Sequence, residues 1–147
     1  AESLFGAEDV IVLIHDGVRP LINEEIIKSN IESVKKYGSA ITCSAAKETF
    51  VLVDDNEDVY EIPSRKHSRI AKAPQSFYLK DIIEVHRQAL KDGITNSIDS
   101  CTLMHEYGKE LAVVDGPYEN IKITTPDDFY MFRALFDARE NRQLADG

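Results

Sequence analysis

The chain has 147 residues, of which 43% are hydrophobic and 29% are charged, as is usual for one globular domain. Its formal net charge of −9 argues against a general nucleic-acid binder, because phosphate backbones are bound mainly by clustered Lys and Arg. No apolar run approaches the roughly 20 residues that a membrane-spanning helix needs, and we expect no secretory signal.

The first part of the chain predicts a strand, a helix and a second strand. Residues 10–14 form a largely β-branched run, typical of a strand buried on both faces of a parallel sheet. Asn23 is a good N-cap for a helix that continues to Tyr37 and ends at Gly38. Residues 39–46 predict another buried strand. This order predicts a βαβ unit.

Residues 47–73 predict an arm that projects from the sheet. Short strands at 47–53 and 58–62 flank a polar turn, and the basic segment 65–69 follows them. A basic segment in an acidic protein favours a small anionic ligand. A solvated edge strand protected by charge accounts for it equally well.

The remainder of the chain contains three helical patterns and two strand patterns. Residues 79–91 and 97–107 carry apolar residues at helical spacing, and each helix is closed by a glycine. Residues 111–114 and 120–124 predict strands. A last helix begins at Thr125, followed by proline and two acids. We expect its aromatic stripe to pack in the core; it consists of Phe129, Phe132 and Phe136.

The charged residues that follow two of these strands are candidates for a ligand site, because ligands of parallel α/β sheets lie beyond the carboxyl ends of the strands. Asp16 is suited to hold Mg²⁺ or orient a substrate, or to cap a backbone amide. Arg19 is suited to a phosphate, although an ordinary surface arginine fits as well. Lys122 faces away from Ile121 and Ile123, so it is either a surface lysine or a group that stabilises phosphoryl charge.

The cysteines and the glycines argue against metal, disulfide and triphosphate-binding motifs in this chain. Cys43 and Cys101 form no metal-binding or disulfide pattern, which indicates a reducing cytoplasm. The seven glycines include no GxG pair and no P-loop. Because a triphosphate needs a glycine-rich cradle or a cluster of cations, we expect this chain alone to hold one poorly.

Four segments resemble the 2-C-methyl-D-erythritol 4-phosphate cytidylyltransferases and the related ribitol-5-phosphate cytidylyltransferases, and they occur in the family's order. They are VLIHDGVRP (12–20), AKETFV (46–51), IPSRKHSRIAKAPQSF (62–77) and ENIKITTPDDF (119–129). The resemblance implies a Rossmann-like α/β nucleotidyltransferase fold, of which this chain is a part, with a projecting β-hairpin arm that clasps a partner subunit. It implies Mg²⁺-dependent transfer of cytidine monophosphate from CTP to an alditol phosphate, with release of pyrophosphate.

The resemblance also implies residue roles. Asp16 and Arg19 would contact substrate and nucleotide, with Asp16 near the metal. Thr49 and Arg65 on the arm would bind the alditol phosphate, and Arg65 would reach the other subunit of a homodimer. Lys122 would contact the nucleotide and stabilise the pentacoordinate phosphorus. The alditol and the pathway, isoprenoid precursor or wall and capsule polymer, stay open; two segments lean to the ribitol branch.

Three departures from the family matter. Ala73, Pro74 and Gln75 stand where the family usually has Thr-Pro-Gln. In the segment 97–101 only Asp99 clearly matches the family's pattern. The glycine-rich loop of the family, with its Arg and Lys, has no counterpart. We therefore expect residues 1–147 to be the C-terminal part of one cytidylyltransferase domain, with the arm at about 47–73, and to be inactive alone.

Two alternatives belong to other classes. His15 and Asp16 resemble the metal pair of an HD-type phosphohydrolase, but those ligands come from helices with further histidines. A dimerising or regulatory remnant, which keeps the fold and the arm without turnover, is the stronger alternative.

Overall fold

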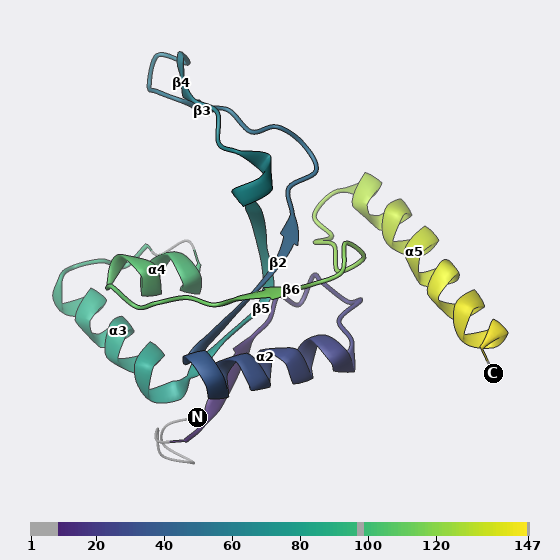
Figure 1. The fold of residues 1–147 in the computed structure, drawn as a ribbon, viewed down its shortest axis with the longest axis horizontal. Helices are drawn as coiled ribbons and strands as arrows, with labels where there is room; N and C mark the ends of the chain where they lie inside the picture. The colour runs from purple at the N-terminus through teal and green to yellow at the C-terminus, as the bar shows by residue number, and fades with distance from the viewer. Residues whose placement is uncertain (1–8, 97–98, 147) are drawn as a thin grey trace.

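A mixed four-stranded sheet forms the centre of the molecule, with strand order β1-β5-β2-β6 (Figure 1). The computed structural model describes residues 9–96 and 99–146. β5 is antiparallel to both β1 and β2, whereas β6 is parallel to β2. The strands are β1 (Ile11–Ile14), β2 (Ser39–Ala45), β5 (Arg69–Tyr78) and β6 (Val113–Asp115).

The predicted strand–helix–strand unit is present, but β5 lies between its two strands. β2 confirms the prediction of a buried strand, since its first five residues are all buried. The prediction for β1 is wrong: it lies at the edge of the sheet, pairs with an antiparallel strand, and is only partly buried. A β-branched run alone does not show whether a strand is buried, because burial depends on partner strands, and here the partner lies more than 60 residues away along the chain.

Helices cover both faces of this sheet. α2 (Glu24–Tyr37) begins where Asn23 Oδ1 accepts a hydrogen bond of 2.9 Å from Ile26 N, and it ends at Gly38 in the left-handed conformation. α3 (Leu79–Lys91) and α4 (Ser100–Glu106) pack on the other face. α3 matches its predicted range, whereas residues 97–98 of the predicted second helix lie outside the described residues.

The two faces have separate apolar clusters. Phe77 and Leu103 are buried in the larger cluster, together with Ile41 from β2. On the opposite face, Val34 of α2 packs with Ala40 of β2, as the alternation of side chains along a strand requires. The chain therefore forms an α/β fold of three layers, in agreement with the expected class.

The arm projects from one end of the sheet (Figure 1) and carries β3 (Leu52–Val53), β4 (Val59–Glu61) and the 3₁₀ helix η1 (Arg65–His67). Its strands are shorter than predicted. Residues 70–73, which we expected in the arm, belong instead to β5, because Ile70 and Ala71 pair with β2.

The aromatic stripe of α5 (Pro126–Ala145) does not lie in the core, so that prediction is wrong. The helix starts as predicted, with a capping box between Thr125 and Asp128. Phe129 and Phe136 are nevertheless 48% and 43% exposed, because α5 extends away from the sheet (Figure 1). None of the helices within the described ranges is long and apolar enough to cross a membrane.

A buried amide links α2 to two strands. The Asn30 side chain donates to Ile26 O and Thr42 Oγ1, each at 2.9 Å, and accepts a hydrogen bond of 2.8 Å from Ser76 Oγ. Asn30, Thr42 and Ser76 are fully buried. Buried polar groups are costly without partners, so this network fixes α2 against β2 and β5.

Asn30→Ala should lower the free energy of unfolding by about 1–3 kcal/mol, because it leaves two buried hydroxyls without this partner. Urea unfolding followed by circular dichroism measures the change. Asn56→Ala, at the exposed turn of the arm, is the control and should cost less than about 0.5 kcal/mol. Equal stabilities of the two variants would show that the network does not hold α2.

Candidate functional site

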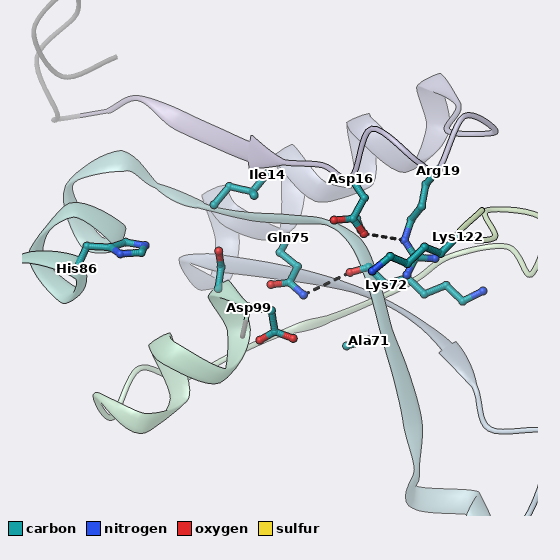
Figure 2. Close-up of a pocket in the computed structure, with 11 residues that line it drawn as sticks. Ile14, Asp16, Arg19, Ala71, Lys72, Gln75, His86, Asp99 and Lys122 are labelled. Carbon is teal, nitrogen blue, oxygen red and sulfur yellow. Dashed lines mark hydrogen bonds and ion pairs between the residues drawn. The ribbon is translucent and has the colours of Figure 1, made fainter. Parts of the chain in front are cut away.

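A cavity of about 450 Å³ lies beside the sheet, where β1 ends and β5 passes (Figure 2). Its wall combines acids, cations and an amide from elements far apart in the sequence. The lining residues include Asp16, Arg19, Lys72, Gln75, Asp99 and Lys122. The structure thus brings together Asp16, Arg19 and Lys122, which the sequence singled out.

Arg19 is a buried part of the cavity wall. It is 9% exposed, and its Nε donates to Asp16 Oδ2 at 3.0 Å while its Nη1 donates to Asn120 O at 2.9 Å. The loop that carries it is closed by Arg19 N donating to Asp16 O at 3.1 Å. A planar guanidinium can serve two acceptors at once, so Arg19 ties the loop after β1 to the loop after β6.

Lys122 lies in that second loop, and the predicted strand 120–124 is wrong. The backbone of residues 120–124 does not pair with a strand; instead Ile123 N donates to Val18 O at 2.9 Å. The side chain of Asn120 also holds this loop, since its Nδ2 donates to Ala73 O at 2.7 Å. Lys122 is exposed between two partly buried isoleucines and lines the cavity, but the strand alternation from which its orientation was predicted is absent. Within the described residues, the ammonium of Lys122 has no hydrogen-bond or ion-pair partner.

Gln75 and Asp99 close the opposite side of the cavity. Gln75 Oε1 accepts a hydrogen bond of 2.8 Å from Cys101 N, which holds the start of α4 against β5. Burial alone would raise the pKa of the Asp99 carboxyl, but hydrogen bonds from Thr102 and Cys101 outweigh burial and lower that pKa. Asp99 is therefore an ionised N-cap that faces the cations across the cavity.

The remaining candidates lie elsewhere. Thr49 and Arg65 are exposed on the arm and do not line this cavity; Arg65 Nη1 donates to Lys47 O at 3.4 Å. His15 Nε2 bonds Arg19 O at 2.9 Å. In the described part of the chain no three His, Cys, Asp or Glu side chains gather as metal ligands.

Sequence reasoning missed three residues here. Asn120 supplies the carbonyl that Arg19 binds, Gln75 positions α4, and Lys72 adds a third cation to the wall. Lys72 could have been found from the sequence, because it is the one charged residue within the otherwise apolar run of residues 70–74.

Both cysteines are free. Burial raises the pKa of the Cys101 thiol to about 11, and the nearby Asp99 raises it too. Since a thiolate is the reactive form, neither the position nor the pKa of Cys101 suits a nucleophile.

The chain has a three-layer α/β fold with acids and cations around a cavity at the ends of its strands, and solved structures of cytidylyltransferases share this fold. The chain belongs to the 2-C-methyl-D-erythritol 4-phosphate cytidylyltransferase family, whose sequence profile matches residues 2–138. The resemblance on which the sequence prediction rested is thereby confirmed.

Relatives from two branches are similar to the chain. It is 64% identical over 144 residues to a ribitol-5-phosphate cytidylyltransferase of Streptococcus agalactiae serotype V, covering 98% of the chain and 60% of that protein. It is 59% identical over 134 residues to one of Vibrio parahaemolyticus, covering 91% and 56%. The structure of a 4-diphosphocytidyl-2C-methyl-D-erythritol synthase of Anaerococcus prevotii matches with a TM-score of 0.79 and 32% identity, covering 86% and 58%. The chain thus spans less than two thirds of the length of these proteins.

Arg19→Lys should lower the free energy of unfolding by about 1–3 kcal/mol, because one ammonium cannot replace both buried hydrogen bonds. Chemical denaturation measures the change. Arg133→Lys, on the exposed surface of α5, serves as the control and should cost less than about 0.5 kcal/mol. If Arg19→Lys is as stable as the control, the guanidinium does not join the two loops.

Proposed function

We propose that the protein containing this chain transfers the cytidylyl group of CTP to an alditol phosphate and releases pyrophosphate. The observation that carries the proposal is the convergence of Asp16, Arg19 and Lys122 on one cavity in a member of this family. An oxygen of the acceptor phosphate forms a bond to the α-phosphorus of CTP, and the bond from that phosphorus to the bridging oxygen of pyrophosphate breaks.

Ribitol 5-phosphate is the acceptor that we favour. The identities of 64% and 59% are to proteins named for that substrate, whereas the structure named for the methylerythritol derivative is 32% identical. With this acceptor the product is an activated pentitol for a wall or capsule polymer, and with methylerythritol 4-phosphate it is an isoprenoid precursor.

Lys122 and Arg19 have separate roles in this proposal. Such transfers depend mainly on positioning and on stabilising charge at phosphorus. The ammonium of Lys122 is exposed and has no partner among the described residues, so it can approach the phosphoryl oxygens, which makes it the stabilising group. Arg19 is engaged with Asp16 and Asn120, so it holds the loops and presents its remaining N–H groups to the nucleotide.

Mg²⁺ fits this cavity. The Asp16 side chain is 46% exposed, and among the described residues only its Oδ2 has a bonding partner, Arg19, so Oδ1 remains available to an ion. A hard cation bound to phosphates uses one or two carboxylates and completes its shell with water and substrate. Asp16 would hold the ion, which would neutralise phosphate charge when bound.

The arm suits a homodimer. Its exposed apolar residues lie around a two-stranded ribbon that the other described residues of this chain do not cover; among them are Val51, Val59, Tyr60 and Ile62. A ribbon of this size needs further packing for stability, which a partner subunit would supply. Thr49 and Arg65 would then contact the acceptor in the partner's site. We also retain the cytoplasm as the expected location, from the two free cysteines.

The function is tested by pyrophosphate release from CTP by the full-length protein with Mg²⁺. We expect turnover with ribitol 5-phosphate and slower turnover with methylerythritol 4-phosphate. Lys122→Ala should lower kcat about 10²–10³-fold, because it removes a charge that acts on the transition state. Release with neither acceptor would contradict the proposal.

The control for Lys122→Ala is Lys28→Ala, which removes an exposed lysine paired with Glu24 on α2. It should leave kcat and both KM values unchanged. If Lys122→Ala instead raises KM for the substrates as much as it lowers kcat, then Lys122 binds the ground state and the assigned role is wrong.

The arm is tested by mixing two inactive variants, Arg65→Ala and Lys122→Ala, after dissociation and reassociation. If Arg65 acts across subunits, half of the random dimers carry one intact site, and about a quarter of wild-type activity should return. Recovery requires subunit exchange, which size-exclusion chromatography of tagged subunits verifies. No recovery after exchange would place Arg65 in its own subunit's site.

A further inference from the structure

A second cavity, of about 310 Å³, lies where the arm leaves the sheet. Residues of β2, β5 and the arm form most of its wall. Among the described residues that line it, Tyr118 alone comes from elsewhere, and it belongs to the loop after β6 that also carries Asn120 and Lys122. The cavity therefore marks the place where the base of the arm meets the loop of the candidate site (Figure 1).

Strand pairing between β2 and β5 does not fix the direction of the arm. This pairing ends at Ala45 and Arg69, and the two legs of the arm, residues 46–51 and 62–68, form no strand. The backbone of the arm pairs again in the short ribbon of β3 and β4. Contacts at the base of the arm therefore set its direction relative to the sheet.

The ring of Tyr118 supplies such a contact. Lys47 Nζ, on the first leg of the arm, lies 4.0 Å from the centroid of this ring. Lys72 Nζ, on β5, lies 5.3 Å from the same centroid and donates to Tyr118 O at 3.5 Å. Because the ring quadrupole attracts a cation over the ring face, Tyr118 joins the arm both to β5 and to the loop of Lys122.

No ion pair takes the place of this contact. In the described part of the chain no carboxylate oxygen lies within 4.0 Å of the ammonium of Lys47 or Lys72. Burial lowers the pKa of the Lys72 ammonium, and the positive charges of Arg19 and Lys47 lower it further. Since the two ammonium groups repel each other, the ring beside both of them is the group that stabilises their position.

The contacts continue from Lys47 to Arg65. Arg65 Nη1 donates to Lys47 O at 3.4 Å, so the lysine whose ammonium lies on the ring also holds the guanidinium of Arg65 through its carbonyl. In the proposed function Arg65 contacts the acceptor in the partner's site. The contacts from Tyr118 through Lys47 to Arg65 therefore lead from the loop of one subunit's site toward the site of the other subunit.

We infer that Tyr118 is a positioning residue, whose ring fixes the arm through Lys47 in the direction that delivers Arg65 to the acceptor. This role rests on the proposed function, in which Arg65 serves the partner's site. Tyr118 acts through Lys47 rather than on the substrate. Because the contact uses the face of the ring and not its hydroxyl, phenylalanine should replace tyrosine at this position without loss.

The first test measures Tyr118→Leu, Tyr118→Phe and Lys47→Met in the full-length protein. Tyr118→Leu and Lys47→Met should each raise KM for ribitol 5-phosphate about fivefold, as expected for one lost cation–π contact. Both variants should change kcat and KM for CTP less than about twofold. Tyr118→Phe should match the wild type. The double variant should be no worse than either single variant, because both substitutions remove the same contact.

Tyr37→Leu is the matched control, because it removes a pair on α2, outside both cavities, in which Lys36 Nζ lies 4.9 Å from the Tyr37 ring. It should leave both KM values unchanged. An unchanged KM for ribitol 5-phosphate in Tyr118→Leu, or an equal loss in Tyr118→Phe, overturns the inference. Equal increases of both KM values together with a lower melting temperature indicate a purely structural role and overturn it too.

The second test determines the subunit in which Tyr118 acts. Tyr118→Leu is mixed with an about tenfold excess of Lys122→Ala, so that after exchange most sites with an intact Lys122 receive the arm of a Lys122→Ala subunit. That arm keeps its tyrosine, so KM for ribitol 5-phosphate should return to the wild-type value. Arg65→Ala mixed in the same way should also recover, because both residues act through the arm. Recovery of only one of these two variants overturns the inference.

Hydrogen exchange separates this inference from the proposed function. It follows the backbone amides of the arm, among them His67 N, which donates to Ser64 O at 3.1 Å. Tyr118→Leu should speed up exchange in residues 46–68 about fivefold, and Tyr118→Phe should not. If wild-type protein transfers no cytidylyl group, the function fails and exchange decides the inference. Faster exchange in Tyr118→Leu but not in Tyr118→Phe supports it, and equal exchange in both variants and the wild type overturns it.

Discussion

The bridge from Arg19 to Asp16 and to the Asn120 carbonyl is the constraint on which the site depends. The two loops that it joins are about a hundred residues apart in the chain, and each carries a candidate functional group. A buried guanidinium is stabilised only when its donors are satisfied, so the loops cannot separate without leaving a buried charge unpaired. Lys122 follows Asn120 by two residues and is therefore placed beside Asp16 by the same bridge.

The sequence predicted the elements whose signals are local. α2 and α3 were found because caps and helical spacing lie within the helices themselves. The insertion of β5 between β1 and β2 could not be predicted, because no single segment encodes a pairing between distant strands. The strand expected at 120–124 failed for a related reason: apolar alternation is present, but the backbone there bonds a loop at Val18.

The site was partly predictable in the same sense. Asp16, Arg19 and Lys122 were identified because each follows or interrupts an apolar run. The segments around them also resemble those of a known family. Lys72 and Asn120 were missed, since their positions acquire meaning only when β5 crosses the sheet beside the first loop. The aromatic stripe of α5 is a different case. Its helical spacing is clear, but that spacing alone does not tell whether the stripe packs in the core, and the structure leaves it exposed.

The charge distribution reconciles an acidic protein with anionic substrates. The chain carries a net charge of −9, yet its described cavities gather Arg19, Lys47, Lys72 and Lys122. A local positive potential inside an acidic surface favours small phosphates over long nucleic acids, which contact many surface residues at once.

The most direct test of the central claim is a crystal structure of the full-length protein with CTP and Mg²⁺. Our account predicts Lys122 Nζ about 2.7–2.9 Å from an oxygen of the α-phosphate, with Arg19 still bridging Asp16 and Asn120 O. A nucleotide whose α-phosphate lies outside the cavity of Asp16 and Lys122, or a bridge broken on binding, would contradict it.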